Sequence, residues 1–301
     1  MSGEIYDKMV TETINGLTLN DLVGGGDPKK IGEDILDFLQ MEKLVAVGSK
    51  VLEIGCGCGR AAVPLISFLN QGQGHYTGVD IVPGLIEFSR REIASRFRRS
   101  DFFVVQQNNP LYDSFIDLAS LESDLFAGDY FKSRGPFDLV IAFSVFTHLG
   151  EADARRMLSD IFGALCDGGV AAISFFILDD FSRKQVCRGD AQFFHNALDS
   201  DGVKIDEYNG PNSAVGFDDH LLHAMISDAG FEGIYSQHAG SWRSTLGRQF
   251  QDMIVLKKSE PLPANFDAKA YCEVNPDVAA VGINPAYHYR AFGRSECRQL
   301  S

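Results

Sequence analysis

In Val51-Leu52-Glu53-Ile54-Gly55-Cys56-Gly57-Cys58-Gly59-Arg60, a short apolar run is followed by a turn rich in small residues. The apolar run predicts a buried parallel strand, and the small residues predict a sharp turn into a helix that begins near Arg60. Gly55, Gly57 and Gly59 tolerate positive φ angles and leave the main chain bare, so that a ligand can lie against it. In open α/β sheets, such a turn lies at the carboxyl end of a strand, where nucleotides and cofactors bind.

The glycine spacing distinguishes this turn from a dinucleotide-binding turn. The dinucleotide fingerprint is G-x-G-x-x-G, whereas these glycines alternate as G-x-G-x-G, with Glu53 two residues before the first of them. A carboxylate at that position would repel a pyrophosphate, but it suits a ligand that carries an ammonium group and no phosphate. The plain alternative is a tight connection between a strand and a helix, which also uses glycine.

A second acidic residue lies near the end of the next predicted strand. The run 75–83 is rich in β-forming residues and contains Asp80, about twenty residues beyond the glycine turn. A carboxylate at this place can accept hydrogen bonds from both hydroxyls of a ribose. Glu53 can bind the amino-acid end of a ligand, the glycines can lie under its middle, and Asp80 can bind a ribose. S-adenosyl-L-methionine has these three parts.

With these two motifs, the chain resembles the class I S-adenosylmethionine-dependent methyltransferases. The family's first motif is V-L-E-I-G-C-G-C-G-R at 51–60, and its second, acidic motif is G-V-D-I at 78–81. The resemblance covers roughly 21–258. It implies an α/β fold with a seven-stranded, mostly parallel Rossmann-like sheet and an antiparallel edge strand. It also implies S-adenosyl-L-methionine as the cofactor and S-adenosyl-L-homocysteine as the product.

We expect the cofactor to lie at the carboxyl ends of four strands. Ile81 is placed to pack on the adenine, and Gln106 stands where family members usually carry an acid for the adenine amino group. The amide oxygen of Gln106 can accept from that amine, although a structural role is the alternative. The predicted cofactor-binding residues are Glu53, Gly55, Cys56, Gly57, Gly59, Arg60, Asp80, Ile81, Gln106, Asn108, Phe143 and Ser144.

His148 is the candidate catalytic base. It follows the predicted fourth strand, 137–143, whose end faces the sulfonium methyl group in the fold that the chain resembles. A neutral imidazole can take the proton of an acceptor hydroxyl, which typically contributes about 10²- to 10⁴-fold. The alternative roles for His148 are a backbone hydrogen bond at the start of the next helix or stacking beneath the adenosine. His220 or His223 is the reserve candidate for the base.

The predicted methyltransferase domain, 1–258, contains two segments that we expect to cover the bound ligands. The glycine-rich segment 24–27 is either part of a lid over the cofactor or a plain connector. In 178–216 the periodicity fades, and we expect this insertion to recognise the acceptor, because loops at strand ends lie over the ligand; the alternative is an ordinary solvent-exposed excursion. The tetrapeptide 240–243, with the only tryptophan, suits either an aromatic platform for a sugar or packing onto the sheet.

A proline-containing linker precedes a predicted helical appendage at 265–301. This unit resembles a short helical module found at the ends of bacterial glycosyltransferases and surface proteins. Because this module occurs in glycosyltransferases, it favours by association a glycan as the acceptor and a role of the protein in bacterial glycan modification.

The composition limits the function further. The net charge of −14 disfavours nucleic acid as a partner. The sequence contains no run of eighteen apolar residues, so we expect no membrane span. The six cysteines are scattered without metal-binding spacing, so we expect no metal site and a reduced, cytoplasmic protein. The predicted function is O-methylation of a small molecule or glycan by direct methyl displacement. An NAD-binding oxidoreductase and a non-catalytic S-adenosylmethionine-binding module are the alternatives.

Overall fold

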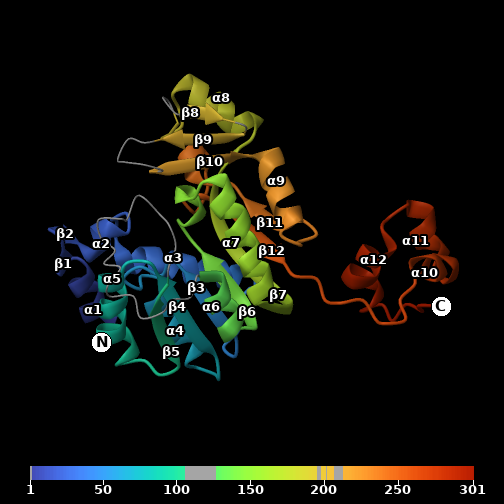
Figure 1. The fold of residues 1–301 in the computed structure, drawn as a ribbon, viewed down its shortest axis with the longest axis horizontal. Coiled ribbons are helices and arrows are strands. Elements are labelled where there is room, and N and C mark those ends of the chain that lie inside the picture. The colour runs from blue at the N-terminus through green and yellow to red at the C-terminus, as the bar shows by residue number, and fades with distance from the viewer. Residues whose placement is uncertain (1, 106–126, 195–197, 201, 207–212) are drawn as a thin grey trace.

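In the computed structural model, the strand of the glycine motif is β3 (Lys50–Ile54), which lies inside a large mixed sheet (Figure 1). The structure describes residues 2–105, 127–194, 198–200, 202–206 and 213–301. β3 pairs in parallel with β4 (His75–Asp80) on one side and β6 (Phe137–Ala142) on the other. The carboxyl ends of these strands therefore share one edge of the sheet, as the sequence predicted.

The main part of the sheet confirms the predicted α/β class. Its strands follow the order β5-β4-β3-β6-β7-β12-β11, in which the first five are parallel. β12 runs antiparallel to β7, and β11 antiparallel to β12, which supplies the expected antiparallel edge. The bounds of the strands not yet given are β5 (Ser100–Val104), β7 (Leu165–Leu178), β11 (Ile234–His238) and β12 (Asp252–Lys257).

The described part of the sheet has ten strands, three more than the seven expected. The additional strands come from the predicted acceptor insertion, and they are β8 (Leu198–Ser200), β9 (Val203–Asp206) and β10 (Ala214–Asp218). β7 is 14 residues long, so that β12 pairs along 170–175 while β10 pairs in parallel with 176–178. β8 and β9 have 3 and 4 residues, which is too short for an alternating pattern to identify them in the sequence.

Helices cover both faces of the sheet. Alternate residues of β3 are buried on opposite faces, because Leu52 belongs to one cluster of buried apolar side chains and Val51 to the other. The first cluster includes residues of α6 (Ala127–Arg134), α7 (Glu151–Ala164) and α9 (Asp219–Asp228). The second includes residues of α1 (Ser2–Met9), α3 (Pro28–Met41), α4 (Ala62–Leu69) and α5 (Pro83–Ser89).

Shorter elements complete the described part of the chain before the C-terminal helices. A small hairpin and a one-turn helix precede α3, and a longer helix opens the insertion. These elements are β1 (Thr13–Ile14), β2 (Leu17–Thr18), α2 (Leu19–Leu22) and α8 (Asp180–Arg188).

The C-terminal helices have an apolar cluster of their own and are set apart from the sheet beyond an extended segment (Figure 1). Tyr271, Val278 and Tyr289 are buried in this cluster. Ion pairs of Arg290 with Glu232 and of Arg294 with Glu260 connect the helices to the preceding chain. The helices are α10 (Ala268–Val274), α11 (Pro276–Val281) and α12 (Pro285–His288).

Within the described ranges, we find no helix with the length and apolar character that crossing a bilayer requires.

Candidate functional site

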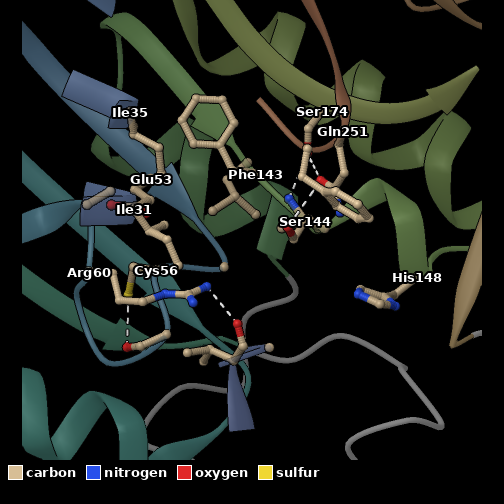
Figure 2. Close-up of a pocket in the computed structure, with 18 of the residues that line it drawn as sticks. Ile31, Ile35, Glu53, Cys56, Arg60, Phe143, Ser144, His148, Ser174 and Gln251 are labelled. Atoms are coloured by element: carbon tan, nitrogen blue, oxygen red, sulfur yellow. Dashed lines mark hydrogen bonds between the residues drawn. The ribbon is translucent and has the colours of Figure 1, made fainter. Parts of the chain in front are cut away.

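The carboxyl ends of β3, β4 and β6 border a cleft of about 980 Å³ (Figure 2). This volume is at the upper end of the range of about 300 to 1,000 Å³ for small-molecule sites, so a cofactor and an acceptor can share the cleft. Most of the residues predicted to act together line it. They are Glu53, Gly55, Cys56, Gly57, Arg60, Asp80, Ile81, Phe143, Ser144 and His148.

Of the predicted cofactor residues that the structure describes, Gly59 does not line the cleft. Gly59 has a φ of +89° and faces the helix side, where an added Cβ would lie 2.3 Å from Cδ1 of Ile93. Gly59 thus shapes the turn instead of bordering the ligand space. Gln106 and Asn108 lie outside the described residues.

Glu53 is a buried carboxyl at the floor of the cleft, with an exposed fraction of 6%. The hydroxyl of Tyr76 donates a hydrogen bond to its Oε2. Burial raises the pKa of Glu53 to about 8, although the Tyr76 hydrogen bond and the charge of Arg60 oppose the shift. Burial therefore disfavours the carboxylate, and a bound ammonium group is the kind of ligand that would favour it again.

Tyr76 was not among the predicted site residues, because its role follows from the register between β3 and β4. Glu53 pairs across the sheet with Gly78, and Tyr76 lies two residues before this glycine on β4. Residues two apart on a strand share a face, and the glycine leaves room for the tyrosine ring to reach the carboxyl group.

Asp80 joins the glycine turn to the end of β4. Its Oδ2 accepts from the backbone amide of Gly57 at 2.8 Å, and its Oδ1 accepts from that of Val82 at 2.9 Å. Burial raises the pKa of Asp80, whereas these backbone hydrogen bonds lower it. A carboxylate oxygen can accept more than one hydrogen bond, so the group can hold the turn and still accept from a ribose hydroxyl.

Two positions of the turn require glycine. Gly55 has a φ of +71°, and an added Cβ would lie 2.5 Å from Cγ2 of Val145. Gly57 has a φ of +53°, and its Cβ would lie 2.7 Å from Cγ1 of Val23. The turn therefore needs glycine at both positions, for its backbone conformation and for close packing against Val145 and Val23.

An N-terminal segment borders the cleft from the other side. Arg60 donates from Nη1 to the carbonyl of Gly25 at 3.0 Å and from Nη2 to the carbonyl of Val23 at 2.6 Å. Gly24, Gly25 and Gly26 all line the cleft, and Asp27 caps α3 by accepting from two backbone amides. The guanidinium of Arg60 thus holds this segment against the glycine turn that precedes α4.

A polar network connects the ends of β6 and β7 to the start of β12 (Figure 2). Ser144, with a φ of +57°, donates its backbone amide to Oγ of Ser174 at 2.7 Å. The hydroxyls of Ser144 and Ser174 both donate to Oε1 of Gln251, at 3.1 and 2.6 Å. Sequence reasoning missed Ser174 and Gln251, because only the folded sheet brings these distant positions together.

His148 lines the same cleft from a short 3₁₀ turn (Phe146–His148) that follows β6. Its backbone amide donates to the carbonyl of Val145 at 3.0 Å, and its side chain is half-buried. Figure 2 shows Ser144 between His148 and Glu53, so the histidine is on the side of the cleft away from the buried carboxyl. The reserve bases His220 and His223 lie on α9 and do not line the cleft.

Trp242 and the cysteines of the glycine turn are buried in the core. Trp242 is fully buried and donates from Nε1 to Oδ2 of Asp252 at 2.8 Å, which corresponds to the packing alternative. Cys56 and Cys58 are buried free thiols, and burial raises the pKa of Cys58 to about 12. Within the described ranges, no three His, Cys, Asp or Glu side chains gather as a metal site would require.

A family model for a methyltransferase domain matches residues 52–171 of the chain. Aklanonic acid methyltransferase DauC of Streptomyces sp. (strain C5) is 30% identical to it over 112 residues. The alignment covers 36% of this chain and 49% of that protein, so the chain spans about half the length of this curated relative.

Solved structures with a similar fold cover most of the chain. PH0226 protein from Pyrococcus horikoshii OT3 matches with a TM-score of 0.50 and 16% identity, over 80% of this chain and 95% of that one. Magnesium protoporphyrin IX methyltransferase from Synechocystis PCC 6803, with bound S-adenosylhomocysteine, matches with a TM-score of 0.48 and 17% identity, over 86% and 94%.

Proposed function

This chain contains a methyltransferase domain of the class I, S-adenosylmethionine-dependent kind, and from that premise we propose that it methylates a hydroxyl group of a small molecule or glycan. One observation carries the proposal. Glu53 and Asp80, from neighbouring strands, line the same cleft together with the bare main chain of Gly55 and Gly57.

The proposed assignment of the cofactor follows from the chemistry of these groups. Glu53 accepts from the ammonium group of the amino-acid end, and Asp80 accepts from the ribose hydroxyls. Ile81 packs against the adenine. When bound, the cofactor would supply a methyl group on a positively charged sulfur, and attack of an acceptor oxygen on that methyl carbon would release S-adenosylhomocysteine as the leaving group.

The chain's own contribution is alignment, exclusion of water and removal of a proton. Alignment of two reactants can lower a barrier by about 7 to 11 kcal/mol. The N-terminal segment held by Arg60 covers the cofactor and limits the access of water. As the oxygen–methyl bond forms and the carbon–sulfur bond breaks, His148 takes the proton that leaves the acceptor hydroxyl.

The relative from Streptomyces supports a small-molecule acceptor, because its name states aklanonic acid as the compound that it methylates. The resemblance of the C-terminal helices to a module of glycosyltransferases is the reason to keep a glycan as the other acceptor class.

Two other functions make different predictions for binding and turnover. An NAD-binding oxidoreductase would need a turn that accepts a pyrophosphate, whereas Glu53 places a buried carboxyl beside the glycines. A non-catalytic module would bind the cofactor without methylating any acceptor.

Calorimetry of the full chain with S-adenosylhomocysteine and, separately, with NAD tests the cofactor. We expect binding of the first only, and binding of NAD alone would overturn the proposal. Mass spectrometry of hydroxylated acceptors incubated with the enzyme and S-adenosylmethionine then tests turnover, since each transfer adds one methyl group to the acceptor.

A further inference from the structure

Three phenylalanines that line the cleft lie with their rings close together. Phe176 lies near the end of β7, Phe193 follows α8, and Phe250 precedes β12, and all three line the cleft. The ring centroids are 5.3 Å apart for Phe176 and Phe193, 5.9 Å for Phe193 and Phe250, and 6.3 Å for Phe176 and Phe250. We call these three residues the phenyl wall.

Two other aromatic side chains pack against Phe176 of the phenyl wall. Phe194 and Trp242, both fully buried, contact Phe176 at centroid distances of 5.6 and 5.1 Å. The Trp242 side chain is fixed in turn by its hydrogen bond to Asp252. Phe176 is therefore held in place before a ligand binds, which lowers the entropy cost of binding against it.

The outer part of the wall leaves apolar surface in contact with water. Phe250 is 41% exposed and Phe193 is partly buried, so an apolar ligand that covers them gains the free energy of removing this surface from water. A phenyl ring offers no hydrogen bond. A sugar would contact the wall only through its C–H face, which offers less apolar area than the face of a planar aromatic ring, so the wall gains less from a carbohydrate.

A polar group adjoins the phenyl wall within the same cleft. Ser174 lies two residues before Phe176 on β7, and Gln251 is the residue after Phe250, so the Ser144–Ser174–Gln251 network borders the wall. The cleft thus offers an apolar surface beside hydroxyl and amide groups, which suits a ring that carries a hydroxyl group.

We propose that the methyl acceptor is a planar aromatic compound with a ring hydroxyl, packed against the phenyl wall with its hydroxyl directed to Ser144 and Gln251. This inference rests on the proposed function and narrows its acceptor to aromatic hydroxyl compounds. A glycan acceptor is the competing outcome of the test.

The test uses the full chain saturated with S-adenosylhomocysteine. We titrate it with 1,8-dihydroxyanthraquinone, as a planar aromatic hydroxyl probe, and with maltose, as a carbohydrate probe, and we measure the heat of binding. We expect the aromatic probe to bind at least tenfold more tightly than the sugar. Equal binding of the two probes, tighter binding of maltose or no binding of the aromatic probe would overturn the inference.

Variants locate the binding surface. Phe250 is exposed, so that loss of its ring leaves the core intact. Phe250→Ala should weaken binding of the aromatic probe about tenfold and leave the affinity for S-adenosylhomocysteine unchanged. Phe181→Ala is the matched control, because Phe181 is 45% exposed on α8 and does not line the cleft. Equal effects of the two substitutions on the aromatic probe would overturn the assignment to the phenyl wall.

The two proposals fail in distinguishable ways. If S-adenosylhomocysteine binds normally and the aromatic probe does not, the acceptor inference is wrong and the cofactor proposal stands. If S-adenosylhomocysteine itself does not bind, the proposed function is wrong, and the acceptor inference falls with it.

Discussion

The protonation of Glu53 should control how tightly the cofactor binds. Because burial raises the pKa of Glu53 to about 8, the carboxyl is mostly protonated at lower pH and must lose its proton to accept an ammonium group. We expect the affinity for S-adenosylhomocysteine to rise by up to about tenfold per pH unit between pH 6 and 8 and then to level off. Calorimetry in buffers of different ionisation enthalpy should show a proton released on binding at pH 6.

Glu53 should also affect stability without ligand. The folded state keeps a proton that the unfolded state loses above its ordinary pKa of about 4.3, so this group destabilises the protein progressively as the pH rises towards 8. Glu53→Gln is the control for both effects, because an amide does not titrate in this range. A wild-type affinity that does not change with pH would contradict the proposed contact between Glu53 and the ammonium group.

The proposed base makes a separate prediction at the residue scale. We expect His148→Ala to lower turnover by about 10²- to 10⁴-fold with the affinity for S-adenosylhomocysteine unchanged, because proton removal affects the chemical step. His223→Ala is the matched control, since His223 lies on α9 outside the cleft. Full turnover by the His148→Ala enzyme with an acceptor that the wild type methylates would refute the role.

At this scale, the sequence predicted the residues that belong to short local motifs. Glu53 and Asp80 could be identified because each stands at a fixed place next to a strand end or a glycine. Ser174, Gln251 and Tyr76 could not, because their roles depend on which strands become neighbours and on the register between them.

Among the elements, the segment from Val23 to Gly26 depends on Arg60. The planar guanidinium reaches two carbonyls at once, whereas a lysine ammonium cannot match this fork. We therefore expect Arg60→Lys to speed amide hydrogen exchange in this segment and to weaken the affinity for S-adenosylhomocysteine about fivefold. Mass spectrometry of exchanged peptides checks the first effect and calorimetry the second.

A matched substitution separates this local effect from a general one. Arg156→Lys changes an exposed arginine on α7 and should leave exchange in the N-terminal segment as it is in the wild type. Unchanged exchange in Arg60→Lys would mean that other contacts hold the segment.

The sequence predicted the strands of the main sheet well, since each is an apolar run of ordinary length. Prediction failed where elements are short or irregular. The insertion forms α8 and three brief strands, and α5 is followed directly by a π-helical turn (Arg90–Ala94). Neither outcome leaves a periodic pattern in the sequence.

For the whole molecule, a buried ion-pair network connects the insertion to the sheet. Asp252 is fully buried and accepts from backbone amides of Gly240 and Ile177, at 2.7 and 2.9 Å. Arg243 pairs with Asp252 at 2.7 Å and with Asp179, the cap of α8, at 2.5 Å. The start of the insertion is thus attached to β12 through a single guanidinium.

Removal of that guanidinium should destabilise the fold strongly. Arg243→Met leaves the buried carboxylate of Asp252 without this cation, which typically costs about 3 to 5 kcal/mol of unfolding free energy. Denaturant unfolding measures the loss. Arg156→Met, at an exposed ion pair, should unfold like the wild type, and an equally small effect of Arg243→Met would contradict a stabilising role for the network.

The extension of β7 beyond its pairing with β12 separates the proposed cofactor residues from part of the phenyl wall. Glu53 and Asp80 lie on β3 and β4, whereas Phe176 lies on the extension of β7, Phe193 lies in the insertion that follows it, and Phe250 precedes β12. We therefore expect the insertion, 178–216, which supplies Phe193, to influence the choice of acceptor without altering the cofactor site. A chimaera that received this segment from a methyltransferase of different preference should adopt the donor's acceptor and retain the recipient's affinity for S-adenosylhomocysteine. Loss of that affinity would show that the two halves are not independent.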